Sequence, residues 1–187
     1  RFKCDWSSDV CSSDLIVNLR GVRVRFNMTN QTNVPLYFNM ALVAPRSGDL
    51  ITTAADFATT NFYRDPGTAT RSVAFSDGGL SGFGRNLLPL NTDEFSVLWH
   101  YRRIFGPHLN SSGYSSGARP PNWGTLSRYV KLGRQVRYDA GGGASCQNPV
   151  WLIWWINEFN STPSATPVTN RMNLNFHIVT YWRNPKR

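Results

Sequence analysis

Residues 125–159 read TLSRYVKLGRQVRYDAGGGASCQNPVWLIWWINEF, and this stretch decides the fold. Apolar and polar residues alternate between Tyr129 and Tyr138. One face of the predicted strand carries Val130, Leu132, Val136 and Tyr138, and the other carries Lys131, Gln135 and Arg137. A period of two is typical of a strand with one buried and one solvated face. The sequence therefore predicts a strand whose solvated face is cationic.

A glycine-rich connection follows this strand and leads to a second one. Asp139 to Ser145 (DAGGGAS) supplies the positive-φ positions that a chain reversal needs. Pro149 then opens VWLIWWI, which is apolar on both faces and fits a central strand buried on both sides. We expect one alternating set of this run in the sandwich core and the other at a sheet face or subunit contact. The two sets are Trp151, Ile153 and Trp155, and Leu152, Trp154 and Ile156.

Four more segments show the alternation of a strand. They are Ile16 to Met28, Val34 to Val43, Glu94 to Phe105 and Met172 to Trp182. In the third we expect Phe95, Val97, Trp99 and Tyr101 on one face, and in the last Leu174, Phe176, Ile178 and Trp182 pointing inward. Residues 44–90 hold only short apolar pieces, at 56–63 and 71–75, among turn signals and long loops, so we expect one or two weaker strands there.

Six clear strands and about two weak ones predict an all-β fold. A chain of 187 residues suits one domain with a sizeable core, and its richness in turn residues disfavours a helical bundle. An antiparallel eight-stranded jelly-roll sandwich accommodates strands joined by loops of very unequal length. An immunoglobulin-like sandwich is the alternative, but the paired cysteines of that pattern are missing.

The first fifteen residues are interpreted separately. Asp5 to Asp14 (DWSSDVCSSD) can be back-translated into the sequence of a common sequencing-library adapter. We interpret residues 1–15 as a segment that is not native to the protein, and residues 16–187 as its one domain. Without that segment the chain keeps 18 basic and 8 acidic residues, a net charge of +10, and one cysteine, Cys146, which fits a reducing compartment.

The charge balance points to a polyanionic partner. The whole chain carries a net charge of +9, mostly from arginine, whose planar guanidinium binds phosphate in a bidentate way. Basic residues recur on the polar faces of several predicted strands, a pattern that fits sequence-independent binding to a nucleic-acid backbone. A solvated cationic face is the simpler alternative. The candidate nucleic-acid-binding residues are Arg23, Arg25, Arg102, Arg103, Lys131, Arg137 and Arg183.

Catalytic and metal-binding patterns are missing from the sequence. His100, His108, His177 and Cys146 are scattered without the spacing of metal ligands, and no close carboxylate pair suggests acid–base chemistry. The longest apolar run, VWLIWWI, is far shorter than the roughly 20 residues of a membrane span. We therefore predict a protein that is not an enzyme, with no cofactor, no metal and no membrane partner.

The strand sequences resemble those of one protein family. RYVKLGRQVRYD followed by NPVWLIWWINEF, with EFSVLWHYRRIFGP upstream and RMNLNFHIVTYWRNPK at the end, is similar to the late strands of capsid proteins from circovirus-like viruses. These viruses encode a Rep protein and have a circular single-stranded DNA genome. The resemblance covers roughly residues 17–187, and its motifs are diffuse strand patterns.

The resemblance implies a specific biology. It implies a jelly-roll capsid subunit that assembles, as about 60 copies, into an icosahedral shell around single-stranded DNA. It places the protein in the virion, and in the host nucleus during assembly, and it implies no particular host receptor. The family has an arginine-rich arm before the first strand, and here the adapter-like residues occupy that place. This departure puts packaging in doubt, but not the shell fold.

Two other functions fit the same residues. One is a non-viral β-sandwich module that binds nucleic acid or glycan, and the other is the capsid of a small RNA virus. Assembly separates the first of these from a capsid, since a module stays a species of roughly 20 kDa while a subunit forms uniform shells.

Overall fold

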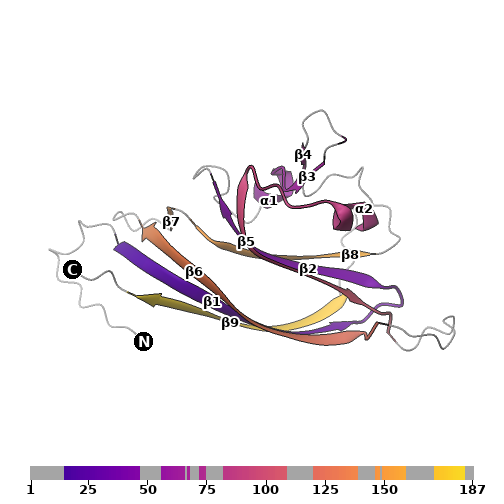
Figure 1. Ribbon diagram of the computed structural model, residues 1–187. Helices are drawn as coiled ribbons and strands as arrows, with labels where there is room; N and C mark the ends of the chain where they lie inside the picture. Colours follow the sequence, from indigo (N-terminus) through magenta and orange to yellow (C-terminus); the bar gives the residue numbers. More distant parts are fainter. Residues whose placement is uncertain are drawn as a thin grey trace.

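The computed structural model describes residues 15–46, 56–65, 67, 72–74, 82–108, 120–138, 146–147, 149–158 and 171–183. Two antiparallel sheets are stacked face to face, and a small cap covers one of them (Figure 1). The four-stranded sheet has the order β7-β6-β1-β9, formed by β7 (Cys146–Gln147), β6 (Trp123–Tyr138), β1 (Leu15–Asn30) and β9 (Met172–Arg183). The three-stranded sheet has the order β5-β2-β8, formed by β5 (Phe95–Phe105), β2 (Leu36–Pro45) and β8 (Trp151–Glu158).

All six clearly predicted strands are present, so the all-β, antiparallel prediction is confirmed. Their boundaries differ slightly from the expected ones. β1 begins at Leu15, which pairs with Tyr138 of β6. β6 begins at Trp123, which pairs with Thr29 of β1. Of the adapter-like residues 1–15, Leu15 begins β1; residues 1–14, the connection 139–145 and the loop 160–170 lie outside the described residues.

The six long strands form three consecutive pairs, each with one strand in either sheet. β1 and β2, β5 and β6, and β8 and β9 form three such pairs, which follow one another in the same order across both sheets. The buried Asn30 fixes the turn of the first pair, since its Nδ2 donates to the carbonyl oxygens of Val34 at 2.8 Å and Gly106 at 2.7 Å. An ion pair of 2.8 Å between Arg171 and Glu158 holds the third pair together. These contacts bring the loops of neighbouring pairs together at one end of the sandwich.

The first hydrophobic core lies between the sheets. Alternating residues of β1, among them Val24, Phe26 and Met28, face Phe38 and Met40 of β2, and all of them are buried. Phe26 and Phe38 have ring centroids 6.4 Å apart. This is the arrangement that alternation predicts, in which one face of each strand packs on the opposite sheet.

A second core lies on the other side of the three-stranded sheet, under the cap. The cap consists of α1 (Asp56–Thr59), β3 (Tyr63–Arg64), β4 (Ser72–Val73) and α2 (Gly82–Leu87). Phe57, Phe62 and Tyr63 of this region pack on Ala41 and Val43 of β2. β2 thus has an apolar layer on each side, and all ten of its residues are buried.

The cap was only partly predicted. The apolar piece at 56–63 begins with the helix α1 rather than a strand, and the weak strands are the two-residue β3 and β4. Gly82 and Gly84 belong to the helix α2. The described residues include no helix with the length and apolar character that a membrane crossing requires.

Two predictions for the strand VWLIWWI need correction. It was expected to be a central strand reached by a reversal from β6, but β8 is at the edge of the described three-stranded sheet while β6 belongs to the other sheet. Its two-sided burial is nevertheless real, because Leu152 and Ile156 pack into the inter-sheet core while Ile153 and Trp155 pack into the cap core. A strand can be apolar on both faces when a layer covers each face, even if another strand pairs with only one of its edges.

The expected single face of β5 is also wrong. A register shift occurs where Val43 pairs with Val97 and Leu42 pairs with Trp99, which leaves Leu98 as the extra residue of a β-bulge. Phe95 and Val97 therefore pack in the cap core, whereas Trp99 and Tyr101 pack in the inter-sheet core. A bulge changes which face successive alternate residues occupy, and the alternation of the sequence does not reveal it.

Candidate nucleic-acid interface

The outward face of the four-stranded sheet gathers basic side chains from three strands. Arg23 of β1 has Tyr129 of β6 on one side and Val179 of β9 on the other. Arg25 has Ser127 and His177 as its neighbours, and Gly21 has Lys131 and Tyr181. Opposed residues share a face of the sheet. Since Val22 and Val24 are buried in the core, Arg23, Arg25 and Lys131 point away from it.

Two more predicted residues reach the same face beyond an irregularity in β1. Val136 is buried, so its neighbour Arg137 points outward. Asn18 of β1 lies opposite both Arg183 of β9 and Gln135 of β6, so these residues share a face. Arg137 is two residues beyond Gln135 and lies on that face too. The structure therefore brings together five of the seven predicted residues on one surface. We call this surface the basic face, and it comprises Arg23, Arg25, Lys131, Arg137 and Arg183, with Arg20 at the β1 irregularity.

The charge of the four-stranded sheet has one sign. Its three long strands carry eight basic residues and no acidic residue. The described acidic residues lie on the other side of the sandwich, in the cap, in the segment that leads into β5 and at the end of β8; they are Asp56, Asp65, Asp93, Glu94 and Glu158. Cations on strands that carry no carboxylates of their own favour a positive potential, which attracts a polyanion.

A groove crosses the basic face beside the irregularity in β1. The register shifts between Leu19 and Gly21, which leaves Arg20 unpaired in the ladder. The groove has a volume of about 480 Å³. Its lining residues are Arg20, Tyr129, Lys131, Gly133, Thr180, Tyr181 and Trp182. The rings of Tyr129 and Tyr181 meet edge to face, with centroids 5.5 Å apart.

Arg102 is not part of the basic face. It lies on the cap side of the three-stranded sheet, where its Nε donates to Oδ1 of Asn39 at 3.1 Å and its guanidinium also donates to the carbonyl oxygen of Asn86. The Oδ1 of Asn86 accepts from Nδ2 of Asn39 at 3.0 Å and from Nδ2 of Asn157 at 3.3 Å. The guanidinium thus helps to fasten α2 to the sheet.

Arg103 is also separated from the basic face. Its guanidinium carbon is 5.2 Å from the centroid of the Phe105 ring, within the range of a cation–π contact. The guanidinium also lies close to Gly124 of β6, where a Cβ would collide with it. Arg103 therefore occupies the border between β5 and β6, and packs against the edge of the sandwich.

Burial perturbs two titratable groups under the cap. Burial raises the pKa of the Tyr63 hydroxyl beyond its usual range, and the nearby charges of Arg85 and Arg102 oppose this shift. Burial lowers the pKa of His100, and the positive charge of Arg102 lowers it further. The His100 ring stacks on Trp155 with centroids 6.0 Å apart. Both groups belong to the packing of the cap and are remote from the basic face.

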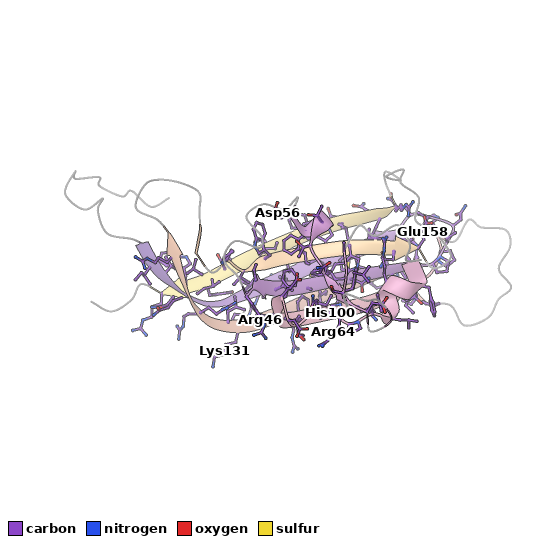
Figure 2. The ribbon with its side chains drawn as sticks, turned by 90° about the horizontal axis from the view of Figure 1, so that it is seen from above. Arg46, Asp56, Arg64, His100, Lys131 and Glu158 are labelled. Atoms are coloured by element: carbon purple, nitrogen blue, oxygen red, sulfur yellow. The ribbon has the colours of Figure 1, made fainter. Side chains whose placement is uncertain are left out.

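The side-chain view separates the two sides of the molecule. Seen from above, Lys131 projects beyond the lower margin of the ribbon, whereas Asp56 lies at its upper margin (Figure 2). Arg64 forms an ion pair of 3.5 Å with Asp93. In the described part of the chain, no group of three or more His, Cys, Asp and Glu side chains is arranged to hold a metal ion.

Sequence reasoning missed two residues of this surface. Arg20 follows Leu19 and precedes Gly21, and its position becomes informative only when the register shift is known. Tyr181 was overlooked because β9 was interpreted by its inward residues. Trp182 was expected to point inward, so its neighbour Tyr181 could have been assigned to the outward face by alternation. A scan against protein-family models finds no matching family, and a search of curated proteins finds no match.

Proposed function

We propose that the chain is a structural subunit of a small icosahedral viral shell that packages circular single-stranded DNA against its basic face. The observation that carries this proposal is the basic face, which lies on a four-stranded sheet whose long strands hold eight basic and no acidic residues in total. Such a face neutralises a phosphate backbone without reading its sequence. The side chains that perform this role are those of the basic face, and no catalytic step is involved.

The open edge of the sandwich supports assembly. β8 and β9 are the last strands of their described sheets on the same side of the molecule. Trp154 and Phe176, with ring centroids 5.5 Å apart, are 40% and 54% exposed there. Exposed aromatic residues beside unpaired strand edges are typical of a surface that another subunit covers.

The fold proposed for this subunit is the eight-stranded jelly roll of viral capsids. Three pairs of consecutive strands, each with one strand in either of two stacked antiparallel sheets, support it. A fourth such pair would complete the eight strands. In this arrangement the basic face lines the shell interior, and about 60 copies close the shell.

Size-exclusion chromatography with electron microscopy tests assembly. The full chain is expected to elute as a large species and to form shells of uniform diameter. A variant with Arg23, Arg25, Lys131 and Arg137 all replaced by Glu is expected to fold but to retain less nucleic acid, because exposed charges contribute little to stability individually. A species of roughly 20 kDa under all conditions would contradict the shell and favour a nucleic-acid-binding β-sandwich module. The nucleic acid recovered from the shells distinguishes DNA from RNA.

A further inference from the structure

We propose that the groove beside the β1 irregularity is a nucleotide subsite, in which one unpaired base stacks on the Tyr129–Tyr181 pair and its phosphate binds Arg20 and Lys131. This inference rests on the proposed function and extends it. Neutralising a backbone requires only charge, whereas this subsite also contacts the bases. The ligand class is single-stranded nucleic acid, since a base paired in a duplex cannot expose its face to a ring.

The backbone creates the space for the subsite. At the irregularity, Gly21 lies between Lys131 on β6 and Tyr181 on β9. Because Gly21 has no side chain, the Tyr129 ring lies across β1 and reaches Tyr181, and a Cβ at Gly21 would collide with that ring. Gly133, with φ of 61°, forms another wall of the groove, and the space at its missing Cβ is open. The groove thus depends on two glycines at the positions where the register shifts.

The aromatic pair presents a stacking surface. Tyr129 is 42% exposed and Tyr181 is 38% exposed, although neither belongs to a hydrophobic core. Their rings are inclined at 79°, so they form a corner in which a base can stack on one ring and touch the edge of the other. Stacking on tyrosine accepts any base, which suits a protein that binds a whole genome.

The charges around the pair suit a phosphate. Arg20 and Lys131 line the groove, and Arg23 is directly opposite Tyr129. Among the described residues that line the groove, none is acidic. Its volume of about 480 Å³ is within the usual range of small-molecule sites, roughly 300–1,000 Å³. Base and phosphate therefore find complementary groups next to each other, as a nucleotide requires.

The test compares two oligonucleotides of equal length, one of thymidines and one abasic, by fluorescence anisotropy with the full chain. The abasic strand keeps the phosphates but offers no base. We expect the wild type to bind the thymidine strand about 5- to 100-fold more tightly than the abasic strand. The double variant Tyr129→Ala, Tyr181→Ala should lose this preference and keep the salt dependence of binding, because no phosphate contact is removed. Tyr129→Phe with Tyr181→Phe should behave like the wild type.

Two controls protect this test. Phe83→Ala removes an exposed aromatic ring from α2, on the capped side, and should leave the preference unchanged. A 2-aminopurine strand mixed with the wild type reports stacking by fluorescence quenching and does not require that the alanine variant folds. The inference is overturned if the wild type binds both strands equally or if 2-aminopurine is not quenched. Backbone binding would survive that result, whereas failure of the wild type to bind either strand would overturn the proposed function as well.

Discussion

Arg25 and Arg102 lie on opposite outward faces of one sandwich, and their surroundings differ. Arg25 is exposed on the four-stranded sheet, with Ser127 and His177 as its neighbours across the ladder. Arg102 is hydrogen bonded to Asn39 and Asn86 between the three-stranded sheet and the cap. Both arginines are exposed, but Arg102 also contributes to internal structure through these hydrogen bonds.

This difference has a physical cause. The three-stranded sheet has apolar residues on both faces, so leaving its outer face in water would expose Ala41, Val43 and Trp155. The cap covers that face, and the polar groups buried with it must find partners. The four-stranded sheet has an apolar face only toward the core, so its other face can remain solvated and cationic. Basic residues are therefore informative about ligands only on the sheet face that no cap covers.

The largest expected effect is the loss of a large side chain from the cap core. Trp155 is 7% exposed and packs its ring against Phe62 with centroids 5.4 Å apart. Trp155→Ala should lower the free energy of unfolding by about 3–5 kcal/mol, measured by chemical denaturation. Trp154→Ala, at the 40% exposed neighbouring position, is the matched control and should cost less. Equal losses at both positions would show that the cap is not a true core.

A smaller effect is expected from the hydrogen bonds between the cap and the sheet. Asn86→Ala removes the acceptor shared by the buried side-chain amides of Asn39 and Asn157. Leaving these donors without that acceptor should cost about 1–3 kcal/mol, measured by thermal unfolding. Asn27→Ala, on the exposed face of β1, should change stability much less. Nucleic-acid affinity should be unchanged in both variants, and a loss of affinity in Asn86→Ala would mean that the capped face also binds.

The smallest effect is a pH dependence that arises under the cap. Since the pKa of His100 is lowered in the folded protein, the unfolded chain takes up this proton first as the pH decreases. The contribution to stability is complete above the unfolded value of about 6.5 and is lost as the pH falls from there through the folded value. His100→Phe should remove this part of the pH dependence in denaturation curves at several pH values. His177→Phe, on the exposed sheet, is the control, and an unchanged profile in His100→Phe would contradict the assignment.

The strands were predictable because their signal is local. In β1 the alternation of Val22, Val24, Phe26 and Met28 with Arg23 and Arg25 is confirmed, since only one face meets the opposite sheet. Alternation also placed Arg137 correctly. It shows which residues share a face, but it does not show whether a polar face meets water or a cap. Alternation therefore does not reveal that Arg102 lies on the cap side, apart from the basic face.

The remaining features depend on contacts distant in sequence. The short apolar pieces around Phe57 and Phe62 become ordered through packing on β2 and β8, so their own sequence predicts little. The bulges at Leu98 and Arg20 arise from the pairing of two strands and change the face of the residues beyond them. The groove at Gly21 follows from such a shift, which explains why Arg20 was missed.

One measurement tests the central claim that binding belongs to the uncapped face. The variant Arg25→Glu, Lys131→Glu and the variant Arg46→Glu, Arg64→Glu change the net charge equally, and all four positions are exposed. The affinity of each for single-stranded DNA is measured across a series of salt concentrations. The first pair should weaken binding and reduce the slope of log affinity against log salt by about 1.4, as expected for two lost phosphate contacts. The second pair should leave the slope unchanged, and equal changes in both variants would contradict the account, because binding would then follow net charge rather than the basic face.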